Sequence, residues 1–205
     1  MENSEIDTMQ KDQKTTRSKK KENFFLSNLH DVVFLVAGIL LVFSLLFRVV
    51  IVSGPSMNNT LIHGDWLLLL SNVFYSDIEQ GDVIVASKES FENGKPIIKR
   101  VIATEGQTVN IDFDAGIVYV DDVALDEPYA LTPTTLYEGV NFPLTVDEGC
   151  IFVLGDNRNG SKDSRSTEIG LIDTREVLGK ALILVFPGNN DGKIERDLSR
   201  IGVVS

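Results

Sequence analysis

Residues 97–121 read IIKRVIATEGQTVNIDFDAGIVYVD and contain three short apolar runs that two turn signals, TEGQ and DAG, separate. The runs are rich in β-branched residues and show no 3.6-residue period, so they predict strands over 97–103, 108–113 and 116–121. Glycine and aspartate at the junctions favour turns. The stretch therefore predicts that strand follows strand with no helix between them.

The same pattern continues through the rest of the chain after residue 53. Turn signals such as EQGD, ENGKP, DEG and GDNRNG separate the further candidate strands, which are 66–70, 82–87, 150–155 and 180–186. Many short strands without a long helical segment indicate an all-β domain rather than βαβ units. A looser periodicity over 118–146 predicts a small inserted β subdomain, over about 115–146, with an extended loop as the alternative.

The composition limits the classes of function. The net charge of −11 lies wholly on residues 32–205, because residues 1–31 hold six basic and six acidic side chains. No basic patch follows residue 31, so we expect no nucleic-acid partner. A single cysteine, Cys150, excludes an intramolecular disulfide, and with only two histidines the chain offers few zinc ligands. We expect neither a metal nor a cofactor.

An apolar segment predicts one membrane anchor, which we assign to residues 31–52. Residues 32–47 carry no charge, and VVIV continues the run after Arg48. The run reaches the roughly 20 residues that a helix needs to cross the hydrocarbon core. A cleavable secretory signal is the alternative, but the apolar part of such a signal usually has only about 7–15 residues.

The charges that flank this segment predict its orientation. RSKKK at 17–21 precedes the segment, whereas Arg48 alone marks its other end. Basic flanks stay on the cytoplasmic side. We therefore expect a single-pass protein of the cell membrane, with a disordered cytoplasmic tail over 1–30 and an extracytoplasmic domain over 53–205.

Ser56 lies in the turn-forming part of RVVIVSGPSMNNT (48–60), directly after the apolar segment. A serine nucleophile needs an adjacent base. His63 lies in a polar turn, and His30 is expected on the other side of the membrane. Carboxylates ionise near pH 4 and are weak bases for a hydroxyl. If Ser56 is catalytic, another kind of residue takes its proton.

Lys99 is the candidate base. Alternate positions of a strand share one face, and Ile97, Val101 and Ala103 place Lys99 on an apolar face, while Arg100 projects from the other. A lysine with its ordinary pKa is almost fully protonated at pH 7, but burial lowers that pKa by up to about 3–5. Serine and lysine form a known catalytic pair. On spacing alone, a solvated surface lysine is the alternative.

Three sequence blocks follow the apolar segment in order. They are SGPSMNNTL (53–61), KPIIKRVIATEGQTV (95–109) and GDNRNGSKDSRSTEIGLI (155–172). They resemble the serine box, the lysine box and the G-D-N-x-x-x-S-x-D-S-R box of the bacterial type I signal peptidases, which are membrane-anchored Ser–Lys proteases. The resemblance runs from the anchor to about residue 187. It implies a signal-peptidase-like all-β catalytic domain, mostly β in class, behind one N-terminal transmembrane helix.

The resemblance also implies a role for each matching residue. Ser56 corresponds to the nucleophile and Lys99 to the general base. The supporting residues that it implies are Ser161, which orients Lys99, the salt-bridged pair Asp163 and Arg165, and Asp156 as the partner of Arg100. Ordinary turn chemistry is the alternative for these loop residues, because Asp, Asn, Gly and Ser favour turns.

The implied partners are exported preproteins and the lipid bilayer. Cleavage after a small-x-small site requires two shallow apolar pockets, and the substrate is expected to bind as an added strand. The residues expected to line these pockets are Met57, Val50, Val52, Leu61, Ile97 and Ile98, with ordinary core packing as the alternative for each. Gly54 is expected to let the substrate backbone approach closely.

Two positions depart from the common pattern of the family. Gly54 stands where some relatives carry a serine that donates to the oxyanion. The N–H of Ser56 is therefore the first expected donor, and the second stays unassigned. Asn59 stands where proline is common, which affects the turn but removes no reacting group.

Two other interpretations remain open. A membrane-anchored β-domain that only binds peptides would have no use for a desolvated lysine beside a serine. A Ser–Lys protease that acts on itself, or on a dedicated partner such as a surface-fibre subunit, would use the same two residues. The sequence does not separate a general signal peptidase from a dedicated one.

Overall fold

The computed structural model describes residues 29–74, 77–89, 91–189 and 196–204. The predicted tail over 1–30 therefore lies almost wholly outside the described residues. Contacts divide the chain into two units, residues 1–45 and 46–205.

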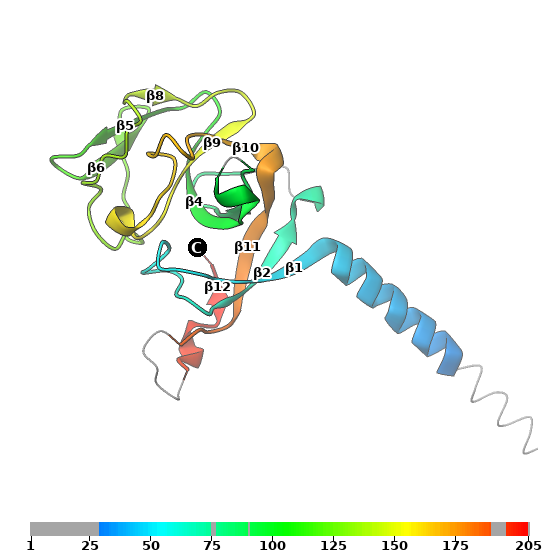
Figure 1. Cartoon of the computed structure of the whole chain (residues 1–205). Helices are drawn as coiled ribbons and strands as arrows, with labels where there is room; N and C mark the ends of the chain where they lie inside the picture. Colours follow the sequence, from blue (N-terminus) through cyan, green and yellow to red (C-terminus); the bar gives the residue numbers. More distant parts are fainter. Residues whose placement is uncertain (1–28, 75–76, 90, 190–195, 205) are drawn as a thin grey trace, which may run out of the picture. The chain divides into compact units, whose positions relative to one another are not determined.

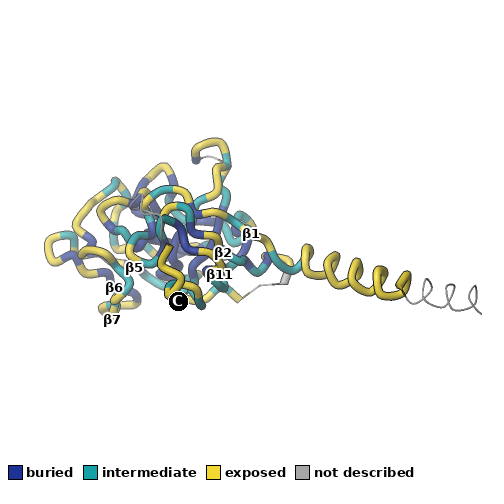
Figure 2. The backbone as a smooth tube through the Cα atoms, turned by 90° about the horizontal axis from the view of Figure 1, so that it is seen from below, coloured by how far each residue is buried: buried dark blue, intermediate teal, exposed yellow. Residues whose placement is uncertain are grey.

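One α-helix, Leu29–Leu46, is described at the N-terminal end of the chain. None of it is buried, and 15 of its 18 residues are apolar or glycine, the exceptions being His30, Asp31 and Ser44. At about 1.5 Å per residue, its length approaches the thickness of a hydrocarbon core. By length and composition, this helix is able to cross a membrane. Figure 2 shows the helix as exposed along nearly its whole length, whereas the β-domain contains many buried residues.

The helix ends earlier than the predicted anchor. Residues after Leu46 were expected to continue the span to residue 52, but Phe47–Ile51 forms strand β1. This strand pairs antiparallel with β2 (Trp66–Ser71). Arg48 is costly inside hydrocarbon, and the β-branched residues that follow it favour extended backbone. The apolar helix therefore ends at Leu46, and most of the segment 47–52, which was expected to belong to the anchor, is a strand.

The larger sheet of the β-domain has the strand order β1-β2-β11-β3-β4-β9-β10, and β12 pairs with β11. All of these pairings are antiparallel. Besides β1 and β2, the strands are β3 (Val83–Ala86), β4 (Ile97–Thr104), β9 (Cys150–Leu154), β10 (Ile172–Asp173), β11 (Val177–Phe186) and β12 (Gly202–Val203). Figure 1 shows β11 running beside β2.

A smaller sheet has the order β7-β6-β5-β8. Its strands are β5 (Thr108–Asp112), β6 (Ile117–Val120), β7 (Val123–Ala124) and β8 (Leu144–Thr145). The turn between β5 and β6 is closed by the Asp112 carboxylate, which accepts from the backbone N–H groups of Asp114 and Ala115. Since β5 belongs to this sheet, the subdomain begins at Thr108 rather than at about 115.

Short 3-10 helices connect several strands. They are η1 (Asn72–Phe74), η2 (Glu92–Gly94), η3 (Arg158–Gly160), η4 (Thr174–Glu176) and η5 (Leu198–Arg200). Every segment that the sequence predicts to be extended forms a strand, with ends that differ by a few residues. The mostly β fold class behind an N-terminal apolar helix is confirmed.

The core of the β-domain consists of three apolar clusters. One lies between β2, β3 and β11 and includes Met57 and Leu61 from the connection between β1 and β2. A second surrounds β3, β4 and β9. The third joins the two sheets and includes Ile102 and Phe152. The β1–β2 connection is thus packed against the same core that holds the central strands.

Candidate active site

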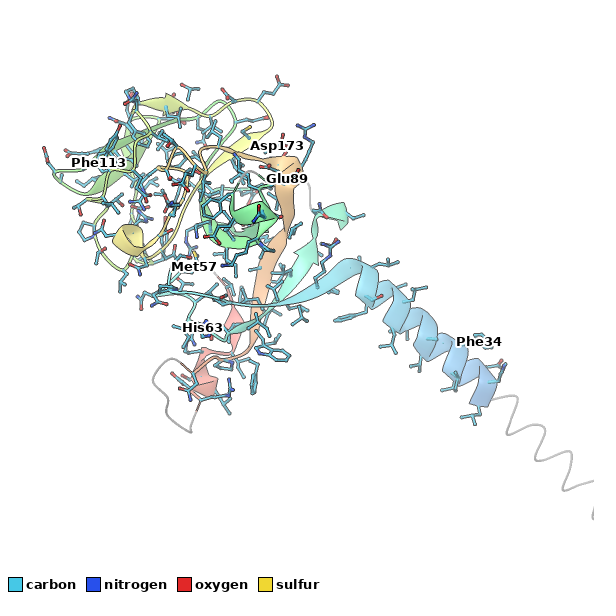
Figure 3. All side chains as sticks on the ribbon, viewed as in Figure 1. Phe34, Met57, His63, Glu89, Phe113 and Asp173 are labelled. Carbon is cyan, nitrogen blue, oxygen red and sulfur yellow. The ribbon has the colours of Figure 1, made fainter. Side chains whose placement is uncertain are left out.

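Ser56 lies in the connection between β1 and β2, which we call the Ser56 loop (residues 52–65). The two ends of this loop are joined, because the N–H of Val52 donates to the carbonyl of Asp65 at 2.8 Å. Met57, directly after the serine, is 1% exposed and packs in the core. Figure 3 labels Met57 and His63 on this loop. A buried side chain therefore fixes the backbone beside the Ser56 hydroxyl.

Lys99 comes from β4, which lies between β3 and β9 in the sheet. Its Nζ donates to Ser56 Oγ at 2.9 Å and to the carbonyl of Ile98 at 3.1 Å. Lys99 is 3% exposed, and Ile84 lies opposite it on β3. The structure therefore brings the buried Lys99 amine to the half-buried Ser56 hydroxyl, and we call these two residues the dyad.

Burial lowers the pKa of the Lys99 ammonium from 10.5 to about 8. The charged form loses its hydration in the apolar sheet, while the carboxylates of Asp163, Asp156 and Glu138 oppose this effect in part. With a pKa near 8, roughly one tenth of the amine is neutral at pH 7. A neutral Lys99 has a lone pair within hydrogen-bond reach of the serine proton, which is the geometry of a nucleophile and its base.

Arg100 and Asp156 form the first predicted supporting pair. Nε and Nη2 of Arg100 donate to the two carboxylate oxygens of Asp156 at 2.9 and 2.8 Å, and both side chains are at most 1% exposed. The hydroxyl of Thr60 donates to the same carboxylate. The guanidinium lies 4.0 Å from the ring centroid of Tyr129. This pair therefore connects β4, next to Lys99, with the Ser56 loop.

Asp163 and Arg165 form the second predicted pair, and both are fully buried. Nε and Nη2 of Arg165 donate to the Asp163 carboxylate at 2.8 and 2.9 Å. Asp163 also accepts from the N–H of Gly155 at 3.0 Å, and Arg165 donates to the carbonyl of Ser161 at 3.2 Å. The pair thus holds the loop that follows β9 in a fixed shape near the dyad.

Ser161 lies beside the dyad, but its buried hydroxyl makes no hydrogen bond within the described part of the chain. A Cβ placed on Gly155 would overlap both Ser161 Oγ and the carbonyl oxygen of Ser56, so both groups occupy the space that a side chain at this position would need. The expected bond from Ser161 to Lys99 is not formed in the structure. The orienting role of Ser161 stays a prediction.

A cleft of about 480 Å³ opens beside the dyad. It is lined by five of the residues predicted to bind substrate, namely Val50, Val52, Met57, Ile97 and Ile98. It is also lined by Phe91, Lys95 and Lys162, which the sequence analysis did not single out. Phe91 and Lys95 precede β4 in an irregular segment, where no period predicts the direction of a side chain.

Two of the predicted substrate-binding residues do not line this cleft. Leu61 is 1% exposed and packs with Leu67 and Leu69 in the core, so its predicted place in the pocket wall is wrong. Gly54 has a φ of +93°, and its N–H donates to Nδ1 of His63 at 3.3 Å. Gly54 therefore shapes the turn before Ser56 rather than the wall of the cleft.

Comparison with known proteins assigns the family. The family model described as signal peptidase, peptidase S26, matches residues 26–186. The chain belongs to this family. Signal peptidase I of Bacillus licheniformis is 32% identical over 87% of this chain and 98% of its own length. Signal peptidase I T of Bacillus subtilis (strain 168) is 32% identical over 84% of this chain and 91% of its own.

A crystal structure of a signal peptidase I from Enterococcus faecalis V583 has 30% sequence identity and a TM-score of 0.43, and the match covers 51% of this chain and 97% of that one. The family match and the two Bacillus relatives confirm the resemblance and the predicted enzyme class, a serine protease of the signal peptidase I type.

Arg158 is a buried residue of this peptidase that the sequence analysis missed. It is fully buried and donates to the carboxylate of Glu127 at 2.7 and 2.6 Å and to the hydroxyl of Thr134 at 2.9 Å. The contacts connect the third sequence block with the subdomain. Nothing in the turn GDNRNG distinguishes this arginine from an ordinary exposed one, because its carboxylate partner lies far away in sequence.

Proposed function

We propose that this chain removes N-terminal signal peptides from exported preproteins, with Ser56 as the nucleophile and Lys99 as the general base. The hydrogen bond of 2.9 Å between Lys99 Nζ and Ser56 Oγ, in a chain of the signal peptidase family, carries the proposal. The low pKa of Lys99 supports it, because a fully protonated amine has no lone pair with which to accept a proton.

The reaction proceeds in two steps through an ester. Neutral Lys99 takes the proton of Ser56 Oγ as this oxygen attacks the carbonyl carbon before the scissile bond. Lys99 then gives that proton to the leaving amine of the mature protein. In the second step, Lys99 takes a proton from water as the water oxygen attacks the ester carbonyl. Lys99 then returns this proton to Ser56 Oγ as the ester bond breaks, so the signal peptide leaves with a free carboxylate and the Ser56 hydroxyl and the neutral amine are restored. The backbone N–H of Ser56 stabilises the developing oxyanion.

The cleft beside the dyad fits the small-x-small site of a signal peptide. Val50, Val52 and Met57, from β1 and the Ser56 loop, and Ile98 from β4 present apolar walls near the serine hydroxyl. Such walls accept small side chains in shallow pockets and are overfilled by larger ones. An extended substrate segment running between β1 and the start of β4 would gain main-chain hydrogen bonds as an added strand.

The N-terminal helix supports a place at the membrane. Leu29–Leu46 has no buried residue, is mostly apolar and is close to the length of a bilayer core. The basic run at 17–21 assigns the N-terminal side of the helix to the cytoplasm and the β-domain to the extracytoplasmic side. In this arrangement, the peptidase meets preproteins on the side of the membrane to which they are exported.

The proposal is tested with the full-length protein in detergent and a precursor that carries an Ala-x-Ala site. We expect cleavage directly after that site, as N-terminal sequencing of the product would show. Ser56→Ala and Lys99→Ala should each abolish cleavage while the circular dichroism spectrum stays unchanged. Arg175→Ala, which changes an exposed residue that does not line this cleft, should leave cleavage intact.

Normal cleavage by either dyad variant would refute the roles of these residues. A wild-type protein that binds the precursor without cutting it would favour the alternative, a membrane-anchored domain that only binds peptides.

A further inference from the structure

The Ser56 loop ends at a buried carboxylate that lies outside the dyad and its two supporting pairs. Asp65 is fully buried and accepts four hydrogen bonds. The donors are the N–H of Ile62 at 2.8 Å, the N–H of Gly188 at 2.6 Å, and Nη1 and Nη2 of Arg200 at 2.9 and 2.7 Å. A carboxylate has about four acceptor sites, so that of Asp65 is fully satisfied.

Two of these donor residues lie beyond residue 186, where the match to the family model ends. Gly188 is pressed against the end of the loop, since a Cβ there would overlap the carbonyl of His63 and lie 2.7 Å from the N–H nitrogen of Asp65. Arg200 ends η5, which is capped by the Asp197 side chain and precedes β12, a strand paired with β11. The backbone that carries each donor is therefore fixed.

Arg200 also reaches the middle of the loop. Its Nη2 donates to the carbonyl of Thr60 at 3.2 Å, while the hydroxyl of Thr60 donates to Asp156. Thr60 is thus held from two sides, by Arg200 on one and by the pair of Asp156 with Arg100 on the other. Arg100 is the neighbour of Lys99 on β4. The distance between Ser56 and Lys99 therefore depends on both attachments of the loop.

We propose that Arg200 is a positioning residue for Ser56, acting through Asp65 and the carbonyl of Thr60. The described residues beyond 186 form a frame for the Ser56 loop. Without Arg200, the Asp65 carboxylate is buried without its charged partner, and the loop must shift to hydrate it. A displacement of about 1 Å of a reacting group is enough to cost roughly 10²-fold in rate.

This inference rests on the proposed function, and it predicts a change in kcat rather than in KM. Arg200 does not line the cleft that we assign to the substrate. In the full-length protein in detergent, with an Ala-x-Ala precursor, Arg200→Ala should lower kcat on the order of 10- to 100-fold. KM should change by less than about twofold, because the cleft walls remain in place.

Two comparisons separate positioning from a general loss of folding. Arg200→Lys keeps the charge but not the two-pronged geometry, so its kcat should fall between those of the wild type and Arg200→Ala. Millimolar guanidinium should restore part of the kcat of Arg200→Ala. Arg175→Ala is the matched control, because Arg175 pairs with Asp173 at the surface and is 88% exposed in its side chain. Its kcat should stay within about twofold of the wild type and should not respond to guanidinium.

The readout is kcat per folded molecule, together with amide hydrogen exchange. Exchange over 57–64 should accelerate in Arg200→Ala while exchange over β9 stays unchanged. Equal kcat per folded molecule in the wild type, Arg200→Ala and Arg200→Lys would overturn the inference. If Arg200→Ala does not fold, the kcat of Arg200→Lys decides alone. If the wild type does not cleave the precursor, the proposed function fails, and exchange over 57–64 still decides whether Arg200 frames the loop.

Discussion

The Lys99 amine sets the expected dependence of activity on pH. Only the neutral amine can take the Ser56 proton, and its pKa lies near 8. We therefore expect kcat/KM to rise about tenfold per pH unit below this value and to level off above it. Initial rates with a precursor peptide from about pH 6 to about pH 10 would measure the midpoint.

Glu138→Gln tests whether the pKa of Lys99 sets the midpoint of this pH dependence. The carboxylate of Glu138 raises the pKa of Lys99, so its removal should move the midpoint to lower pH. A profile that does not change between about pH 6 and about pH 10, or a midpoint near the ordinary lysine value of 10.5, would contradict the assigned role of Lys99.

Single residues were predictable from the sequence where a local pattern marked them. Lys99 stood out because apolar residues alternate around it, and the structure brings it to Ser56. Arg158 and Arg200 were missed because their partners, Glu127 and Asp65, lie 31 and 135 positions away. No spacing rule relates residues so far apart, and only the folded sheet brings them together.

At the scale of elements, the boundary between the apolar helix and the β-domain lies at the start of β1. The sequence shows one continuous apolar run, and hydrophobicity alone does not distinguish a membrane span from a strand next to it. Phe47–Ile51 forms a strand and does not continue the helix because it pairs with β2. The two-residue strands β7, β8, β10 and β12 were not predicted, because two residues are too few to show a period.

A pair of truncations tests whether β1 is part of the enzyme. A variant that begins at residue 47 keeps β1, and we expect it to fold and to cleave a soluble peptide. A variant that begins at residue 53 lacks Val50 and Val52, which line the cleft and pack on the core. Val52 is buried and Val50 is partly buried, and loss of a fully buried side chain costs about 1.5–3 kcal/mol, so this variant should be several kcal/mol less stable once the pairing of β1 with β2 is lost as well.

Urea unfolding and peptide cleavage would measure both variants. The variant that begins at residue 53 should also lose most of its activity, since one wall of the cleft is missing. Equal stability and equal cleavage by the two variants would show that β1 contributes nothing to the β-domain.

At the scale of the whole molecule, the burial that gives Lys99 its catalytic pKa also lowers the free energy of unfolding. Above pH 10.5, Lys99 is neutral in both the folded and the unfolded chain, so its lowered pKa does not change the free energy of unfolding. Between pH 10.5 and about 8, the unfolded chain binds a proton that the folded chain does not bind. Below about pH 8, the cost is complete, and lowering the pKa from 10.5 to about 8 corresponds to about 3 kcal/mol.

Lys99→Met should therefore stabilise the protein while abolishing cleavage. Methionine fills a similar volume without a charge, and the lost hydrogen bonds to Ser56 and Ile98 offset about 1 kcal/mol of the gain. The remaining gain of about 2 kcal/mol would raise the Tm by roughly 4–8 °C at pH 7. This increase should shrink toward zero as the pH approaches 10.5, where the wild-type lysine is neutral in both states. Thermal unfolding of the wild type and of Lys99→Met at several pH values would measure this increase in Tm, with the exposed Lys95→Met as the control. A Tm gain that is absent at pH 7, or equal at every pH, would mean that the pKa of Lys99 is not lowered in the folded protein.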